Sequence, residues 1–314
     1  MDKDKKDLSI VIPVYNEEKN VKDLYEETKG VLSRLGFSYE IIFINDGSTD
    51  NTLEVLSKLK PVKIISFRKN FGQSCALDAG IKMSKGNIII TMDGDNQNDP
   101  NDIPSLIKEI EKGYDVVSGW RCKRKDCFSK IMASFFANFF RKILIKDGIH
   151  DSGCTLKAYK KECFNDLDLY GEIHRFIPGI LRWQGFKIGE IKVNHRFRKN
   201  GKTKYTFTRI IKGFLDLISL WFWRKYSGRP LHFFGGIGAL ISFSGLFIIF
   251  LLFFLRIFGF IYLSGSILPM AGFFMILIGI HFFTSGLLMD VALKNYYKAR
   301  KGSPYHIKEL IEND

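Results

Sequence analysis

The sequence contains little cysteine and no apolar leader, and both shortages narrow the class of protein. Its 314 residues include five cysteines, an odd number without a CxxC pair, so neither a disulfide framework nor a zinc site is indicated. Residues 1–7 alternate in charge and lack the apolar run of a signal peptide, which predicts that the globular part stays in the cytoplasm. Because 46% of the residues are hydrophobic and 25% are charged, an intrinsically disordered chain is excluded.

Charge is almost missing between residues 232 and 289, where Arg256 is the single charged side chain. Residues 231–255 and 269–289 are apolar, and each would form a helix of at least about 30 Å, the thickness of the hydrocarbon core of a bilayer. A segment that contains glycine connects them and permits a turn. We therefore predict a polar globular part joined to a hairpin of two membrane-spanning helices.

The net charge of +14 reflects 47 basic and 33 acidic side chains, and much of the excess lies beside this apolar stretch. Between Arg196 and Arg229 there are ten basic residues and one acidic residue, Asp216. Basic residues that flank membrane spans lie on the cytoplasmic side and attract anionic lipid headgroups. The pattern favours a membrane over nucleic acid as the partner, and predicts a multi-pass protein of the cytoplasmic membrane with both termini in the cytoplasm.

Residues 206–226 combine aromatic and aliphatic side chains with basic ones, which is typical of a helix that lies in the membrane interface. The predicted domains are therefore a cytoplasmic globular domain at 1–205, an interfacial helix at 206–230, the two-helix hairpin at 231–293 and a cytoplasmic tail at 294–314. Packing of the spans against those of a second copy leaves a homo-oligomer open.

In the globular part, strand and helix patterns alternate from residue 8 to residue 119. Continuous apolar segments at 8–15, 39–45, 62–67 and 87–92 are typical of strands buried on both faces, and stretches with helical spacing separate them. This alternation predicts an α/β fold with a mostly parallel sheet covered by helices on both faces. In such a fold, ligands bind beyond the carboxyl ends of the strands.

Acidic residues follow two of these strands. Asp93 and Asp95 come directly after the strand at 87–92, and Gln97 adds an amide oxygen. Hard divalent cations prefer such oxygen ligands. A solvated turn is the alternative for an isolated Asp-x-Asp triplet, but the place of this one after a buried strand favours a metal site. Asp46 follows the strand at 39–45, where turn and helix-cap chemistry is an alternative to ligand binding.

Five sequence motifs occur in an order that resembles family 2 glycosyltransferases of the GT-A fold. They are PVYNEE at 13–18, NDGSTD at 45–50, DGDNQ at 93–97, SGWR at 118–121 and DSGCTLKAY at 151–159. Within this family the chain is similar to the branch of dolichyl-phosphate mannose synthases and bacterial undecaprenyl-phosphate glycosyltransferases, whose bacterial members share the two-span tail. The resemblance covers essentially the whole chain and implies a nucleotide-sugar-binding domain.

The resemblance implies roles for four residues that bind the nucleotide of the donor. Pro13, Tyr15 and Glu17 would line the nucleotide pocket, with Tyr15 against the base. Asp46 would form a hydrogen bond with the base.

A second set of residues would hold the diphosphate of the donor. Asp93, Asp95 and Gln97 would bind Mg²⁺ or Mn²⁺ on the diphosphate, and Arg121 would contact a donor or acceptor phosphate. Gly94 belongs to the same nucleotide-sugar site. It stands where relatives often carry alanine, a difference that is expected to be harmless.

Four basic residues are candidates for binding the acceptor phosphate. Lys157 stands where the family carries arginine, so it keeps a cation but loses the bidentate fork. Arg196, Arg198 and Lys204 lie between the globular domain and the interfacial helix, where a lipid phosphate would reach the protein. General attraction to lipid headgroups is the alternative for these three.

The reaction that the resemblance implies is the inverting transfer of a sugar to a polyprenyl phosphate such as undecaprenyl phosphate. The donor would be a nucleotide diphosphate-sugar, with UDP favoured over GDP. A phosphate monoester is largely dianionic at pH 7, so this acceptor needs no general base. Glu172 as a general base, and His174 and His195 as substrate contacts, therefore stay open.

Two other functions compete with this one. A processive polysaccharide synthase would carry a Gln-x-x-Arg-Trp motif, but Gly179 stands where glutamine is required before Arg182 and Trp183. A noncatalytic membrane partner of a flippase would tolerate a degenerate metal site, and the intact Asp93 and Asp95 disfavour it.

Overall fold

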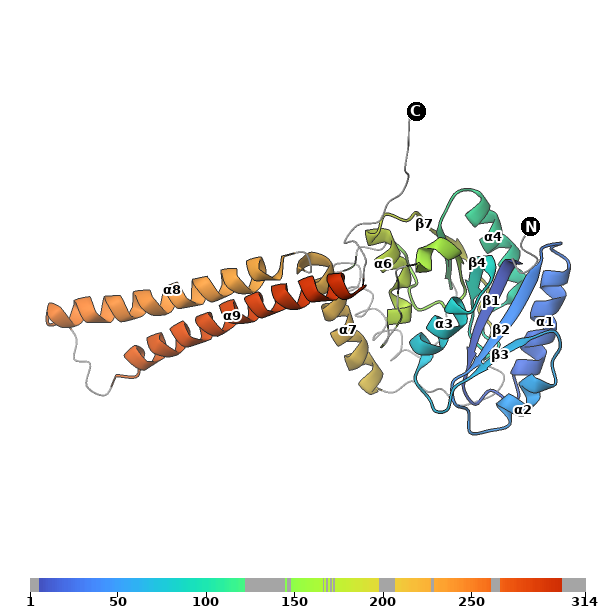
Figure 1. Ribbon diagram of the computed structural model, residues 1–314, viewed down its shortest axis with the longest axis horizontal. Helices are drawn as coiled ribbons and strands as arrows, with labels where there is room; N and C mark the ends of the chain where they lie inside the picture. Colours follow the sequence, from blue (N-terminus) through green and yellow to red (C-terminus); the bar gives the residue numbers. More distant parts are fainter. Residues whose placement is uncertain are drawn as a thin grey trace, which may run out of the picture. The chain divides into compact units, whose positions relative to one another are not determined.

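The computed structural model describes residues 6–121, 145, 148–165, 167, 169, 171, 173–197, 207–226, 229–260 and 266–300 (Figure 1). The chain divides into two compact units, Met1–Ser219 and Leu220–Asp314. Helix α7 (Phe207–Tyr226) contains the boundary between them and coincides with the helix predicted at 206–226. The finer domain limits and the interfacial position of this helix stay predictions.

The first unit is built on a seven-stranded sheet with the order β3-β2-β1-β4-β6-β5-β7. Neighbouring strands are parallel except at β6, which runs antiparallel to both β4 and β5. This arrangement confirms the mostly parallel sheet. The strands are β1 (Lys6–Val14), β2 (Tyr39–Asn45), β3 (Lys63–Ser66), β4 (Gly86–Thr91), β5 (Val116–Trp120), β6 (Lys157–Lys160) and β7 (Ile188–Lys192).

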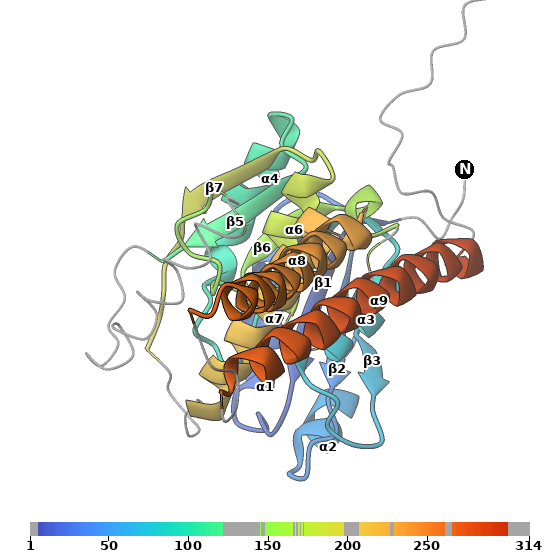
Figure 2. The ribbon, with the colours of Figure 1, turned by 90° about the vertical axis from the view of Figure 1, so that its left-hand side faces the viewer.

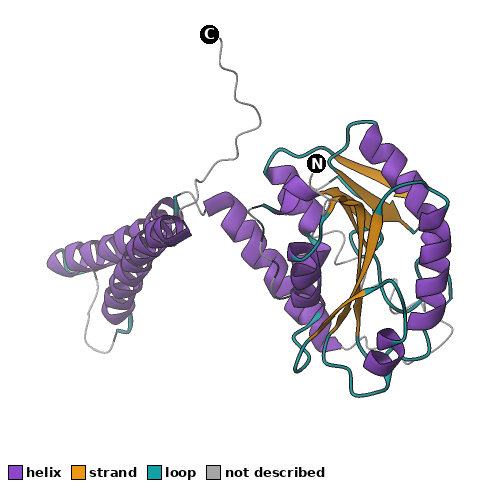
Figure 3. Cartoon of the chain, turned by 45° about the vertical axis from the view of Figure 1, so that its right-hand side comes forward, coloured by secondary structure: helices purple, strands orange, loops and turns teal. Residues whose placement is uncertain are grey.

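Helices cover both faces of the sheet (Figure 3). On one face, Ile10 and Ile12 of β1 belong to a buried core with apolar residues of α1, α2 and α4. On the other face, α3 packs so closely that a Cβ at Gly80 would lie 2.5 Å from Cγ1 of Val11. The helices of this unit are α1 (Val21–Ser33), α2 (Thr52–Ser57), α3 (Gln73–Lys82), α4 (Ile103–Glu111) and α6 (Ile177–Trp183), with short 3₁₀ helices at η1 (Pro100–Asp102), η2 (Lys161–Phe164) and η3 (Ile173–Arg175).

The second unit contains two long apolar helices, α8 (Pro230–Ile257) and α9 (Leu268–Arg300), which lie side by side (Figures 1 and 2). Both are long and apolar enough to cross a membrane, and only 17% of each apolar window is buried. A core helix of a globular protein would bury most of its apolar surface, so these exposed helices indicate a membrane protein. The predicted spans at 231–255 and 269–289 lie inside them.

Glycines allow the two helices of the hairpin to approach closely. A Cβ at Gly238 would lie 2.5 Å from the carbonyl oxygen of Gly279, and one at Gly245 would lie 2.6 Å from that of Gly272. Small residues at such contacts are typical of helix packing in membranes. Gly238 and Gly245 of the first span therefore serve helix packing.

Candidate active site

The sequence motifs meet at one edge of the sheet, where three parallel strands have their carboxyl ends. β1 ends at Val14, which is paired with Asn45 at the end of β2. β4 ends at Thr91, which is paired with Lys157 at the start of the antiparallel β6. The loops after these strands therefore lie together, and this is the edge at which α/β folds bind ligands.

The loop after β1 is fastened to the loop after β2. Asn16 has a φ of 54°, a left-handed conformation that asparagine tolerates well. Its backbone N–H donates to Ser48 Oγ at 2.9 Å, and its side-chain Oδ1 accepts from the backbone N–H of Thr49 at 2.8 Å. The predicted nucleotide residues Pro13, near the end of β1, and Tyr15, in this loop, are both partly exposed.

Glu17, in contrast, is buried, and its Oε2 accepts a hydrogen bond of 2.6 Å from Asn20 Nδ2 at the start of α1. The backbone N–H of Glu17 donates to Thr52 Oγ1 at 2.9 Å. Through these two hydrogen bonds Glu17 connects the start of α1 to Thr52, a structural role that the sequence motif did not predict. Its place in a nucleotide pocket stays a prediction.

Asp46 fastens a third loop to this edge. Its two carboxylate oxygens accept the backbone N–H groups of Phe71 at 2.7 Å and of Gly72 at 3.0 Å. The next residue, Gly47, has a φ of +68°, and a Cβ there would lie 2.3 Å from the backbone carbonyl carbon of Lys69. The carboxylate thus holds the segment before α3 against the end of β2, and its predicted hydrogen bond with a base is untested.

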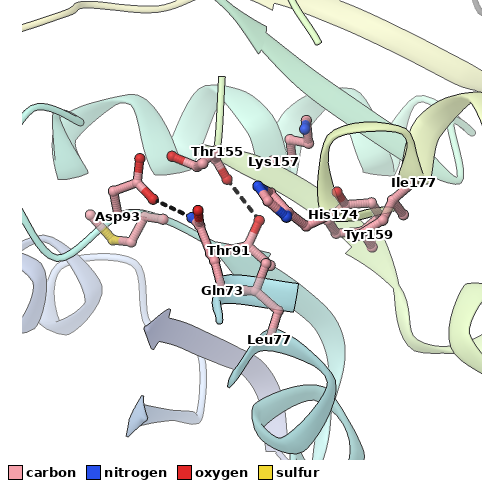
Figure 4. A pocket seen from close by; sticks show the side chains of 10 residues that line it. Gln73, Leu77, Thr91, Asp93, Thr155, Lys157, Tyr159, His174 and Ile177 are labelled. Atoms are coloured by element: carbon pink, nitrogen blue, oxygen red, sulfur yellow. Dashed lines mark hydrogen bonds between the residues drawn. The ribbon is translucent and has the colours of Figure 1, made fainter. Parts of the chain in front are cut away.

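Asp93 and Asp95 lie in the tight turn directly after β4. Oδ1 of Asp93 accepts a hydrogen bond of 2.8 Å from Gln73 Nε2 (Figure 4). Oδ1 of Asp95 accepts from the backbone N–H of Gln97 at 3.1 Å. Gly94 lies between them, where a Cβ would be 2.5 Å from Cγ1 of Val14. Glycine in this chain is therefore not an incidental replacement for alanine, because it lets the turn pack on the end of β1.

The electrostatics of this turn suit a cation. Burial, and then the neighbouring carboxylate of Asp95, raise the pKa of Asp93 to about 6. Hydrogen bonds from Thr155 and Gln73 and the charge of Arg121 oppose that rise but do not cancel it. Two carboxylates that repel each other at a partly buried edge gain free energy from a divalent cation between them.

Among the described residues, no group of three or more His, Cys, Asp or Glu side chains could hold a metal ion. Mg²⁺ and Mn²⁺ are commonly held by one or two carboxylates, with substrate phosphates and water as the other ligands. Asp93 and Asp95 fit that kind of shared site. The side-chain nitrogen of Gln97 donates to the carbonyl of Arg196 at 3.5 Å, and its predicted role as a metal ligand through the amide oxygen stays a prediction.

Two cations, the half-buried Arg121 and the buried Lys157, lie near the carboxylates. Arg121 forms a bidentate ion pair with Asp151, with Nε–Oδ2 at 2.7 Å and Nη2–Oδ1 at 2.9 Å. Burial acts to lower the pKa of Arg121, but the hydrogen bonds and charge of Asp151 raise it above its ordinary value. Lys157 is 3% exposed and donates to the carbonyl of Ser152 at 3.2 Å, and burial lowers its pKa to about 8.

The predicted acceptor residue Arg196 is already engaged. Its Nη1 and Nη2 donate to the two oxygens of Glu27 at 2.7 and 2.6 Å, and Nη2 also donates to Asp99 at 2.7 Å. This ion pair ties the segment after β7 to α1. Arg198, Lys204 and Glu172 lie outside the described residues, and their proposed roles stay predictions.

The sequence did not predict three polar residues of the site. Gln73 binds Asp93, Asp151 pairs with Arg121, and Ser74 Oγ lies 2.8 Å from Nδ1 of the buried His174. Asp151 opens a motif that resembles the family, and this was the one available signal. Gln73 and Ser74 begin a helix whose sequence shows only an apolar face.

The fold and this edge define a glycosyltransferase of the GT-A class. Solved structures of glucosyl-3-phosphoglycerate synthase from Mycobacterium tuberculosis have the same fold. The complex with Mn²⁺, UDP and glucosyl-3-phosphoglycerate has a TM-score of 0.54 and 16% identity, and the match covers 70% of this chain and 80% of that one. The complex with Mn²⁺, UDP-glucose and phosphoglyceric acid has a TM-score of 0.56, with 69% and 80% covered.

Sequence relatives define the family. Residues 9–168 match the model of glycosyl transferase family 2. The chain is 34% identical to dodecaprenyl-phosphate galacturonate synthase of Rhizobium johnstonii, over 98% of this chain and 94% of the relative. It is 33% identical to undecaprenyl-phosphate 4-deoxy-4-formamido-L-arabinose transferase of Photorhabdus laumondii, with the same coverage. The chain therefore belongs to glycosyl transferase family 2.

Proposed function

We propose that this glycosyltransferase transfers a sugar from a UDP-sugar to a polyprenyl phosphate such as undecaprenyl phosphate, with Mg²⁺ or Mn²⁺, at the cytoplasmic face of the membrane. The observation that carries the proposal is the pair Asp93 and Asp95 at the ligand-binding edge of a chain that also has an apolar helical hairpin. The names of the relatives, which act on dodecaprenyl and undecaprenyl phosphate, support the acceptor. The Mn²⁺ and UDP in structures of the same fold support the donor and the metal.

Asp93 and Asp95 would hold the cation, and Pro13, Tyr15 and Glu17 would line the nucleotide pocket. When bound, the divalent cation neutralises charge on the leaving diphosphate oxygens. Gln73 keeps one oxygen of Asp93 occupied, which fixes the orientation of that carboxylate. The loops after β1 and β2 are hydrogen-bonded to each other, so the nucleotide would meet a preorganised edge.

The acceptor phosphate would attack without a protein base. A phosphate monoester is already largely dianionic at pH 7. One of its oxygens attacks the anomeric carbon, the bond from that carbon to the diphosphate oxygen breaks, and the nucleoside diphosphate leaves with inversion at the carbon. Two anions must meet, so nearby cations are required, and Lys157 and Arg121 are both close enough to Asp93 for their charges to act on it.

The membrane hairpin would bring the acceptor to this edge. The proposed topology places the catalytic unit and both ends of the hairpin in the cytoplasm, as the flanking basic residues predict. Arg196 would have to leave its ion pair with Glu27 and Asp99 to bind the acceptor phosphate, as Arg121 would have to leave Asp151.

The test is a transfer assay with the full chain in detergent, undecaprenyl phosphate, Mn²⁺ or Mg²⁺, and a panel of radiolabelled UDP- and GDP-sugars. We expect label from one UDP-sugar in the organic phase, loss with EDTA, and at least about a hundredfold loss in Asp95→Asn. The surface variant Lys58→Ala is the matched control. Donor consumption into water-soluble polymer would indicate a processive synthase. No consumption by folded protein would indicate a noncatalytic partner.

A further inference from the structure

Two hydrogen bonds made by neighbouring residues of α3 connect His174 to the first aspartate of the proposed metal site. His174, in η3, lies with its Nδ1 2.8 Å from Ser74 Oγ, and its backbone N–H donates to the same oxygen at 3.3 Å. Ser74 follows Gln73, whose amide donates to Asp93 at 2.8 Å. Figure 4 shows Gln73, Asp93 and His174 around one small pocket.

The contact between Ser74 and His174 is an interior one. Ser74 is 1% exposed and His174 is 5% exposed. A buried hydroxyl that loses its partner costs more free energy than an exposed one, because no water replaces the lost hydrogen bond. The pair therefore fixes the first turn of α3 relative to η3 firmly.

Side chains from outside α3 are hydrogen-bonded to this first turn and to the residues just before it. The residue before the helix is Gly72, with a φ of 94°, and no side chain caps the helix there. Asp46 accepts the N–H groups of Phe71 and Gly72 on the sheet side, and Ser74 contacts His174 on the other side. Gln73 lies in the chain between Gly72, which Asp46 holds, and Ser74, which contacts His174. The direction of the Gln73 side-chain amide therefore depends on both contacts.

We propose that His174 is a positioning residue for the metal-binding edge. Through Ser74 it holds the first turn of α3 so that the Gln73 amide binds Oδ1 of Asp93 and fixes the orientation of the carboxylate that would hold the cation. His174 itself touches neither metal nor substrate in this role. The inference rests on the proposed metal-dependent function, and it assigns a task to a histidine that the sequence left open.

The test measures Mn²⁺ binding in the presence of UDP by electron paramagnetic resonance on the full chain in detergent, together with kcat and the KM for donor. In Ser74→Ala and in His174→Leu, we expect Mn²⁺ affinity to fall about tenfold, the effect of one buried hydrogen bond. The double variant Ser74→Ala/His174→Leu should bind Mn²⁺ no more weakly than the single variant with the lower affinity, because each substitution breaks the same hydrogen bond between residues 74 and 174.

A conservative variant and a matched control separate positioning from general stability. His174→Asn places an amide atom near the position of Nδ1 and should restore Mn²⁺ affinity to within about threefold. Ser9 is a buried serine at the other end of β1 that accepts from the Gly86 N–H at 2.8 Å and donates to Glu40 at 2.6 Å. Ser9→Ala should lower the midpoint of thermal unfolding and leave Mn²⁺ affinity unchanged.

The inference is overturned if Ser74→Ala and His174→Leu lower only the unfolding midpoint, as Ser9→Ala does, with wild-type Mn²⁺ affinity. If Ser74→Ala does not fold, Ser74→Cys replaces it, since a thiol is a weak hydrogen-bond partner of similar size. A wild-type protein without Mn²⁺ binding or transfer would instead contradict the proposed function. The two failures are therefore distinguishable.

Discussion

Burial moves the pKa values of two opposite charges at the site toward each other. Asp93, beside Asp95, has its pKa raised to about 6, and Lys157 has its pKa lowered to about 8. Between these values the carboxylate is ionised and the ammonium is charged. The proposed site therefore carries both charges in a window that brackets neutral pH.

We expect a bell-shaped pH profile of kcat/KM for the donor at subsaturating Mn²⁺. Below pH 6, Asp93 takes up a proton and loses its affinity for the cation, so the rate falls toward acid. Above pH 8, Lys157 loses its proton and the attraction for phosphate falls, so the rate falls toward alkali. Saturating Mn²⁺ should move the acid limb to lower pH, because metal and proton compete.

Lys157→Arg separates the two limbs. Arginine stays charged at every accessible pH, so this variant should keep the acid limb and lose the alkaline limb. Lys157→Met should lower kcat/KM most below pH 8, where the wild-type lysine is charged, and should approach the wild-type value above it. An alkaline limb that is unchanged in the arginine variant would contradict the assignment to Lys157.

At the scale of elements, the close packing of the turn after β4 on the end of β1 fixes the positions of the Asp93 and Asp95 carboxylates. In Gly94→Ala, the new Cβ would lie 2.5 Å from Cγ1 of Val14 and 3.1 Å from the carbonyl oxygen of Pro13. We expect the turn after β4 to shift, with a loss of stability of about 1–3 kcal/mol and weaker Mn²⁺ binding. Thermal unfolding and electron paramagnetic resonance measure the two effects.

Gly30→Ala is the matched control, because a Cβ in that helix would meet only Arg34 Nη2, at 4.0 Å. It should raise stability by about 0.5–1 kcal/mol. Adding Val14→Ala to Gly94→Ala removes the contacting methyl and should restore part of the Mn²⁺ affinity. Wild-type Mn²⁺ binding by Gly94→Ala alone would show that the turn tolerates alanine, as the resemblance first suggested.

The ion pair of Arg196 with Glu27 and Asp99 joins the segment after β7 to α1. These side chains are 32%, 34% and 14% exposed, so solvent screens the pair and its contribution is about 1 kcal/mol. Arg196→Ala should lower the unfolding midpoint and leave the KM for undecaprenyl phosphate within about twofold. A tenfold rise in that KM would support the original prediction that Arg196 binds the acceptor.

The sequence predicted local structure better than long-range contacts. Apolar runs at 39–45 and 87–92 lie within one residue of β2 and β4, because buried parallel strands are continuously apolar. The antiparallel β6 was not predicted, since its sequence KAYK begins and ends with lysine and the burial of Lys157 comes from the fold. Pairs such as Arg121–Asp151 and Arg196–Glu27 join residues far apart in the chain, and no local pattern encodes them.

At the scale of the whole molecule, a catalytic unit with its own core is joined to an apolar hairpin. The hairpin depends on glycines at the contact between α8 and α9. In Gly279→Leu, the side chain would collide with the Gly238 carbonyl and with Ser242, whereas at Gly236 no atom lies within 4 Å of an added Cβ. The first change should disrupt the hairpin and the second should not.

We therefore expect Gly279→Leu to lower transfer to undecaprenyl phosphate and to broaden the size-exclusion profile in detergent. Gly236→Leu should behave as wild type in both measurements. Mn²⁺ affinity in the presence of UDP should stay unchanged in both variants, because the catalytic unit has a separate core. Equal effects of the two leucines would show that the glycine contact does not support the hairpin.

The central claim is that one sugar passes from a nucleotide to the phosphate of a polyprenyl lipid. Mass spectrometry of the lipid product tests it most directly, after incubation of the full chain with undecaprenyl phosphate, Mn²⁺ and the active donor. The account predicts a lipid heavier by one dehydrated sugar, with a single phosphate and an inverted anomeric configuration. A product that carries a second phosphate, a retained configuration or a polymer of sugars would contradict it.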